Sequence, residues 1–248
     1  MLNGGRLQRE TAKREYNKKC CDDIKMSAGS SIAIASLRHM YEIMNSFSKN
    51  TNKLLKEILD TIVVPIMKNL CSSLVKCHAN AYEKAKNKNQ VFDQTALIDD
   101  VFSHEEVVQT HLNSMRFILK EGNLYLNLNR AQEIWDVLIT NEHSCDWDKQ
   151  IGFEWFIDCW GDLNDESRCE IFKKQVLKLQ AAKLSPKGYE CFKLYFIRVN
   201  ELDNKIQTKN DNDFVVEKLD LIGLNYLWDI ILYALDEKIA DMATKFLL

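Results

Sequence analysis

The sequence predicts an all-α protein in which amphipathic helices stack in pairs and form an α-solenoid. The first observation is composition: the 248 residues include only 2 prolines and 8 glycines, too few turn-forming residues for a sandwich or barrel of many short strands. The second is periodicity, because apolar residues between Leu128 and Leu248 return at steps of three and four between short turns. Each apolar stripe needs a neighbour to cover it, so a row of stacked helices is expected.

Residues 1–30 are polar and end in a run of serine and glycine, which predicts a poorly ordered arm that precedes the array. The arm is mildly basic. We interpret its charge as a solvated surface, with an electrostatic contact as the alternative. Its basic residues are Arg6, Arg9, Lys13, Arg14, Lys18, Lys19 and Lys25. The solenoid itself is predicted to occupy residues 31–248.

Two helices are predicted next, over Leu37–Phe47 and over the stripe Leu54–Val75, where apolar pairs return every four residues. The second stripe contains Pro65. Because proline removes an internal hydrogen bond and collides with the preceding turn, either a kink or a break between two helices is expected there. A polar connector, Lys84–Gln94, follows, and the array either continues through it or is interrupted near 84–102.

Caps and stops mark the later helices. Ser103 and Glu106 form a capping box that opens a helix ended by Gly122. Further helices are predicted from about Arg130, from about Asp146 to Gly161, from Asn164 or Asp165, from Ser185–Pro186 and from Asp236. The polar connector Asn204–Asp213 is predicted to be a flexible loop. The helix that follows it has its core positions at Leu224, Leu227, Trp228, Ile231, Leu232 and Leu235.

Paired helices that recur every roughly 35 to 50 residues fit armadillo or HEAT geometry. The repetition lies in the architecture, since no residue-level repeat signature is visible. Leu247 and Leu248 place apolar residues at the end of the last stripe, without a polar closing helix. A self-contained array needs a polar cap, so we expect an uncapped C-terminal end and further chain beyond Leu248.

Charge and hydropathy narrow the choice of partner. A net charge of −3 with 28% charged residues gives no strong field, so neither nucleic acid nor a membrane surface is predicted as a partner. No stretch approaches the roughly 20 apolar residues of a membrane span, and no signal peptide is recognisable. Most of the eight cysteines fall within helical patterns, as expected of reduced thiols. We expect an intracellular protein, in the cytoplasm or also in the nucleus.

No catalytic, metal or cofactor site is predicted. A cysteine hydrolase needs a thiol beside a histidine, and neither residue type lies in a strained or glycine-rich loop here. Cys20 and Cys21 are expected to be the thiols most open to oxidation, because they lie near the predicted arm. Two sets of trial zinc ligands lack the paired short spacings of a convincing metal site. They are Cys71, Cys77 and His78, and His143 with Cys145.

An aromatic cluster is the main candidate for a binding surface. It consists of Trp147, Phe153, Trp155, Phe156 and Trp160. Aromatic side chains dominate both protein cores and binding hot spots. Core packing is the first interpretation, and a partner groove formed by Trp147, Trp155 and Trp160 is the alternative, since helical spacing turns Trp160 away from the other aromatic residues.

Several segments in order resemble the helical region upstream of the catalytic domain in the giant ubiquitin-specific proteases of the fat-facets type. They are Arg130–Leu138 (RAQEIWDVL), Phe153–Phe156 (FEWF), Ile171–Leu179 (IFKKQVLKL), Tyr189–Phe196 (YECFKLYF) and Val216–Trp228 (VEKLDLIGLNYLW). Asp236–Phe246 (DEKIADMATKF) resembles the armadillo-like helix that follows in those proteins. The resemblance covers about half of the chain, from Arg130 onward, and residues 1–129 are compatible with it.

The resemblance implies a non-catalytic scaffold segment of a deubiquitinating cysteine protease, a ubiquitinyl hydrolase that acts on ubiquitin conjugates. Its expected partners are proteins, either ubiquitinated substrates or the rest of the parent protease. Gly223–Asn225 mimics the family's cysteine box only superficially, because no cysteine follows it. This chain is therefore predicted to be inactive alone. A stand-alone helical-repeat adaptor without enzymatic activity is the alternative, and the coding sequence beyond Leu248 would separate the two.

Overall fold

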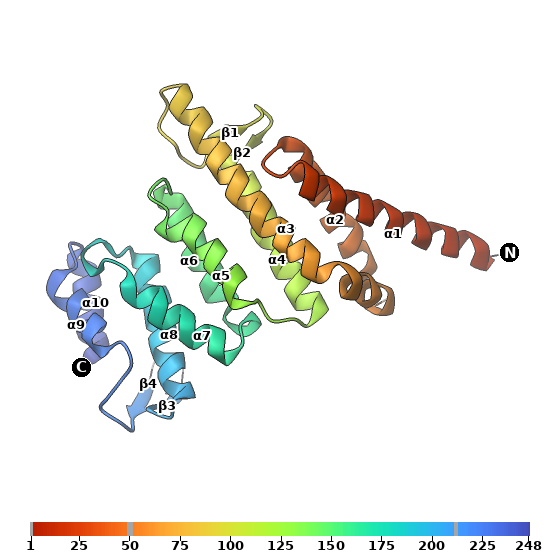
Figure 1. Ribbon diagram of the computed structural model, residues 1–248. Coiled ribbons are helices and arrows are strands. Elements are labelled where there is room, and N and C mark those ends of the chain that lie inside the picture. Colours follow the sequence, from red (N-terminus) through yellow and green to blue (C-terminus); the bar gives the residue numbers. More distant parts are fainter. Residues whose placement is uncertain (1, 49–51, 211–212) are drawn as a thin grey trace. The chain divides into compact units, whose positions relative to one another are not determined.

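A computed structural model describes residues 2–48, 52–210 and 213–248 of the chain (Figure 1). Helices dominate it, and the strands form two short two-stranded sheets, so the predicted all-α class is confirmed. The chain divides into two compact units, which we describe separately. Unit 1 comprises residues 1–125 and 141–147, and unit 2 comprises residues 126–140 and 148–248. The connector near 84–102, where an interruption was considered, lies inside unit 1.

Unit 1 contains two helix pairs, with α1 packed on α2 and α3 packed on α4. In chain order its elements are α1 (Leu2–Met26), α2 (Ser31–Ser48), α3 (Asn52–Asn87), β1 (Leu97–Ile98), β2 (Phe102–Ser103) and α4 (His104–Gly122). One core cluster joins α2, α3, the β1–β2 hairpin and α4 through Ile34, Cys77, Ala81, Ile98 and Val107. Phe92, Ala96 and Phe102 pack against this cluster.

The first residues form helix α1, where the sequence predicted a poorly ordered arm. Asn17, Cys20 and Ile24 are buried, and their spacing of three and four places them on one face of α1. This narrow stripe packs on α2. It was missed because its members are polar or small apart from one isoleucine. The prediction that Cys20 is open to oxidation is also wrong, because its side chain is buried.

Helix α3 runs through Pro65 as a single element, which excludes a break, one of the two alternatives that the sequence left open. Pro65 is exposed. The second half of the predicted stripe is buried through Ile66, Met67, Leu70, Cys71 and Leu74. The side chains of residues 47–64 lie outside the described part of the chain, so the first half of the stripe and Phe47 are not assigned.

The predicted capping box at the start of α4 is confirmed. The Ser103 hydroxyl accepts a hydrogen bond from the Glu106 backbone N–H at 3.2 Å, and the Glu106 carboxylate accepts one from the Ser103 backbone N–H at 2.9 Å. The helix ends differently from the prediction. Gly122 is still helical, and Asn123 takes the left-handed conformation (φ 50°) that closes the helix.

Unit 2 is built from short helices around an aromatic core. They are α5 (Leu128–Trp135), the π-helix η1 (Asp136–Thr140), α6 (Asp146–Asp158), η2 (Trp160–Asp162), α7 (Asp165–Lys174), η3 (Val176–Lys178), η4 (Ala181–Lys183), α8 (Pro186–Leu202), α9 (Leu224–Tyr233) and α10 (Glu237–Leu247). The largest fully buried side chains of unit 2 are Trp135, Tyr195, Phe156, Phe172, Phe192 and Phe196. The predicted caps Asn164, Ser185 and Asp236 each accept a backbone hydrogen bond at their helix start.

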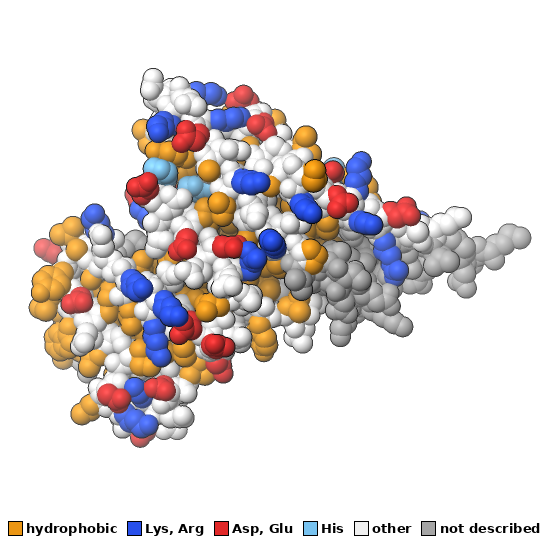
Figure 2. Space-filling model, in the orientation of Figure 1, with side chains coloured by type: hydrophobic (Ala, Val, Ile, Leu, Met, Phe, Trp, Pro, Cys, Tyr) orange, Lys and Arg blue, Asp and Glu red, His pale blue; other side chains and the backbone are white. Residues whose placement is uncertain are grey.

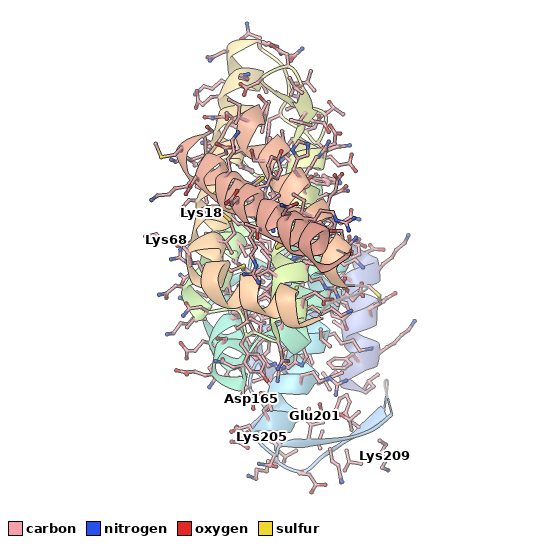
Figure 3. The ribbon with its side chains drawn as sticks, turned by 90° about the vertical axis from the view of Figure 1, so that its right-hand side faces the viewer. Lys18, Lys68, Asp165, Glu201, Lys205 and Lys209 are labelled. Carbon is pink, nitrogen blue, oxygen red and sulfur yellow. The ribbon has the colours of Figure 1, made fainter. Side chains whose placement is uncertain are left out.

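An antiparallel hairpin lies where the sequence predicted a flexible loop. Strands β3 (Ile206–Asn210) and β4 (Asp213–Val216) pair with Ile206 opposite Val216. Figure 3 shows Lys205 and Lys209 at this hairpin. The ammonium group of Lys205 donates to the Asp220 backbone carbonyl at 2.8 Å and lies 3.0 Å from the Asp220 carboxylate. This contact fixes the segment that leads from β4 to α9.

Candidate protein-binding surfaces

The structure places the three predicted tryptophans in different environments. Trp147 belongs to unit 1, where it is half-buried and its ring lies edge-on to His104 at 6.0 Å. Trp155 belongs to unit 2 and is only 6% exposed, with its ring 5.2 Å from that of Phe156. Trp155 therefore contributes to the core and has too little accessible surface to grip a partner.

Trp160 is half-buried on unit 2 and keeps part of its ring accessible. Its indole contacts the ring of Tyr195 edge-on at 4.8 Å, and the Arg168 guanidinium lies over it at 4.8 Å. Arg168 is held in place because its Nε donates to the Trp160 backbone carbonyl at 3.0 Å and Nη1 donates to the Asp165 carboxylate at 2.6 Å. A cation over an indole is an attractive contact, so this surface presents an aromatic ring and a charged group side by side.

A larger exposed apolar surface lies on α9 and α10, where sequence reasoning did not place it. Figure 2 shows hydrophobic side chains gathered over these helices. The exposed residues are Trp228, Leu232, Tyr233, Leu235 and Met242. The prediction that Trp228, Leu232 and Leu235 occupy core positions is wrong, because the buried residues of α9 are Tyr226, Leu227 and Ile230. Nearly every position of α9 is apolar, so the period alone could not tell its inner face from its outer face.

One buried cluster in unit 1 brings a histidine, a hydroxyl and a thiol together. His111 Nε2 lies 3.0 Å from Ser73 Oγ, which lies 3.9 Å from Cys77 Sγ. His111 Nδ1 lies 2.7 Å from the Val107 carbonyl oxygen, which can only accept, so Nδ1 carries the proton. All three side chains are fully buried.

The protonation of this cluster opposes nucleophilic chemistry. Burial lowers the pKa of His111 to about 4 and raises the pKa of the Cys77 thiol to about 11. An activated cysteine needs the reverse, a thiolate beside an imidazolium. Both groups are neutral at physiological pH and are out of reach of a substrate. We interpret the cluster as a satisfied polar contact inside the unit 1 core.

Burial raises the pKa of Cys20 as well. Burial raises the pKa of Cys21 to about 12, and it also raises the pKa of Cys191 and Cys169. The trial metal ligands have separate neighbours: Cys77 faces Ser73, whereas the His78 ring contacts those of Phe92 and His104. The ring of His143 stacks on that of Tyr82 at 3.9 Å.

No helix among the described residues is long and apolar enough to cross a membrane.

Comparison with known proteins identifies the family. Residues 1–200 match the family described as the UBP24/USP9X/USP9Y ARM repeat. Ubiquitin carboxyl-terminal hydrolase 24 of Homo sapiens is 31% identical over 272 aligned residues, which cover 100% of this chain and 10% of that protein. Ubiquitin carboxyl-terminal hydrolase 9Y of Homo sapiens is 34% identical over 158 residues, which cover 62% of this chain and 6% of that protein.

A more distant relative extends the comparison. The probable ubiquitin carboxyl-terminal hydrolase FAF of Drosophila melanogaster is 27% identical over 254 residues, which cover 97% of this chain and 9% of that protein. The chain thus spans about a tenth of the length of the full-length relatives that it matches. The family match also includes residues 1–129, with which the sequence resemblance was only compatible. Together with the helical fold, these matches show that the chain belongs to the UBP24/USP9X/USP9Y ARM repeat family.

Proposed function

We propose that this chain acts as a non-catalytic, protein-binding segment of a large ubiquitin-specific cysteine protease. The observation that carries the proposal is the alignment with ubiquitin carboxyl-terminal hydrolase 24, which covers the whole chain and only 10% of that relative. A segment of this size and helical architecture suits a scaffold, because stacked helices present extended surfaces for other proteins. The buried and neutral His111–Ser73–Cys77 cluster supports the same reading.

The proposed partners are proteins, either ubiquitinated substrates or the rest of the parent protease. The aromatic surfaces at Trp147 and Trp160 are the predicted contact points that keep accessible ring area. Half-exposed tryptophans are suited to this role because a large ring buries much area at a small entropic cost. We propose that this protein binding takes place in the cytoplasm or the nucleus, and we propose no nucleic acid as a partner.

The absence of intrinsic turnover is tested with a ubiquitin substrate that carries a fluorogenic leaving group. We expect the chain to release no fluorophore above the uncatalysed rate, because the cysteines with resolved pKa shifts are all shifted upward. The Cys145→Ser variant and the Cys169→Ser variant, in which partly exposed thiols are removed, serve as controls for contaminating hydrolase. Turnover that one such substitution abolishes would show that the chain is itself an enzyme.

A further inference from the structure

Helix α1 is attached to unit 1 by a narrow buried stripe. It runs antiparallel to α2 (Figure 1), as the contacts of Lys13 with Ser46 and of Asp23 with Ser36 show. Among the described side chains of α1, only Asn17 and, one turn apart, Cys20 and Ile24 are buried. Ile24 is the one large aliphatic residue of the three. Burial of apolar surface is the main source of stabilisation between helices, so the described part of this stripe holds α1 weakly.

The same stripe contains an unsatisfied amide. The Asn17 side chain is 1% exposed, and neither its Oδ1 nor its Nδ2 has a hydrogen-bond partner among the residues that the structure describes. A buried polar group without a partner has lost its hydrogen bonds to water and has gained none in return. When α1 separates from α2, water can reach this amide again. Asn17 therefore opposes the docking of α1, and its cost is comparable to the gain from burying Ile24.

The turn between α1 and α2 is held by contacts with α3. Gly29 takes a φ of 95°, and its carbonyl accepts a hydrogen bond from Asn80 Nδ2 at 2.8 Å. A Cβ added at Gly29 would lie 3.0 Å from Lys76 Cβ, so the turn lies directly against α3. The start of α2 is held as well, because the Ser31 N–H donates to the Asp99 carboxylate at 2.8 Å. Helix α2 therefore keeps these attachments when α1 leaves, and the turn serves as a fixed pivot.

Helix α1 covers a side of α2 that contains two methionines. Met40 and Met44 are fully buried and lie one turn apart, and Cys21 Sγ lies 3.7 Å from Met40 Sδ. We call Met40 and Met44 the methionine face. Methionine side chains are flexible and polarizable, and surfaces that contain them can repack around different partners. Separation of α1 uncovers a surface with this property.

We propose that α1 is a displaceable cover, and that the methionine face binds an amphipathic helix of a protein partner in its place. The occupant is a helix because the face already packs against one, namely α1. It should carry a large aliphatic residue where α1 has Asn17, since such a residue fills the buried position without an unsatisfied amide. The inference depends on the packing of unit 1 alone, and it does not rest on the proposed link to ubiquitin.

Amide hydrogen exchange of the whole chain tests the displacement. We expect the amides of residues 17–24 to exchange at least about tenfold faster than those in the middle of α4, because α1 opens without the rest of unit 1. Asn17→Leu, which introduces an apolar side chain of similar shape, should slow the exchange of α1 at least about tenfold and leave α4 unchanged. Lys18→Leu makes the same kind of change at an exposed position of α1 and should alter neither helix. Equal exchange in α1 and α4, or no effect of Asn17→Leu, would overturn the proposal.

A synthetic peptide tests the occupant. The probe is residues 8–26 of this chain with Asn17→Leu, labelled with a fluorophore and added to the whole chain under reducing conditions. Fluorescence anisotropy measures its binding, and hydrogen exchange shows where it binds. We expect it to bind at least about tenfold more tightly than the same peptide with Asn17, and to remove the protection of α1 in the chain. The probe with Ile24→Asp added should not bind. Failure of the Asn17→Leu peptide to bind, or binding that leaves α1 protected, would overturn the proposal.

Discussion

His111 shows how a buried polar side chain can be built into the core of a helical unit. Its ring is fully buried and bridges Val107 on its own helix to Ser73 on α3. Burial favours the neutral form and lowers the pKa to about 4 from the ordinary 6.5. The unfolded chain takes up a proton below pH 6.5 and the folded chain does not. The stability contributed by the neutral ring is therefore present above pH 6.5 and is lost as the pH falls toward 4.

We expect this group to lower the free energy of unfolding on the order of 3 kcal/mol as the pH falls from 6.5 through 4. The measurement is urea denaturation at several pH values. His111→Leu should be less stable at neutral pH, because Ser73 loses its partner, but its stability should fall less steeply with acid. His39→Leu, which removes an exposed ring next to Tyr16, is the control, and its free energy of unfolding should decrease with falling pH as much as that of the unchanged protein. Equal acid dependence in all three proteins would contradict the assignment.

Gly223 is a residue whose identity is set by geometry. It precedes α9 with a φ of 88°, and a Cβ added there would lie 2.8 Å from Phe172 Cζ. We expect Gly223→Ala to cost about 2 to 4 kcal/mol of unfolding free energy, from backbone strain and overpacking. Gly161→Ala is the matched control, since nothing lies within 4 Å of its added Cβ, and it should change stability by less than about 0.5 kcal/mol. Thermal denaturation of both variants measures these losses, and equal losses for the two variants would contradict the prediction.

At the scale of elements, helix α2 is capped from a distant part of the sequence. The Asp99 carboxylate accepts a hydrogen bond from the Ser31 backbone N–H at 2.8 Å, and this bond lowers the pKa of Asp99. Asp99 also pairs with Lys84 at 3.1 Å, as the neighbouring Asp100 pairs with Lys88 at 3.1 Å. Both aspartates also have a positive φ. The main difference between them is therefore that only Asp99 accepts the hydrogen bond from the start of α2.

This difference gives a matched test. Asp99→Ala should destabilise the protein by about 1 to 2 kcal/mol more than Asp100→Ala, because only the first leaves an N–H at the start of α2 without its acceptor. Both variants suffer the same backbone strain and lose one exposed ion pair. The free energy of unfolding from chemical denaturation is the measurement, and equal losses for the two variants would show that Asp99 does not cap α2.

The sequence predicted those features of each element that depend on neighbouring residues, above all the helix caps. The capping box at Ser103 and the caps at Asn164, Ser185 and Asp236 were predictable, because each uses a side chain within three residues of the helix start. The β3–β4 hairpin was not, because β3 is mostly polar and resembles a loop, and the contacts that hold the segment after β4 are tertiary. The amide of Asn200 on α8 holds the segment between β4 and α9, with hydrogen bonds to both the N–H and the carbonyl of Ile222.

Across the whole molecule, the sequence predicted the all-α class and the repeat family but not which surfaces are exposed. Trp155 is buried, which fits core packing and rules out the alternative of a partner groove at that residue, whereas Trp228 is exposed although it was expected in the core. A period identifies two faces of a helix, and tertiary packing chooses between them. The division into two compact units, with residues 141–147 belonging to the first, also depends on packing that a linear pattern does not record.

The account as a whole depends on this segment binding proteins without taking part in bond cleavage. The most direct measurement uses full-length ubiquitin carboxyl-terminal hydrolase 24, with and without the region aligned to this chain. The rate is measured on a ubiquitin–fluorophore conjugate and on ubiquitinated protein substrates. We predict that the deletion changes kcat/KM for the small conjugate by less than about twofold. For protein substrates it should lower kcat/KM at least tenfold, which corresponds to a loss of about 1.4 kcal/mol or more of transition-state stabilisation. An equal loss on both substrates would contradict the account.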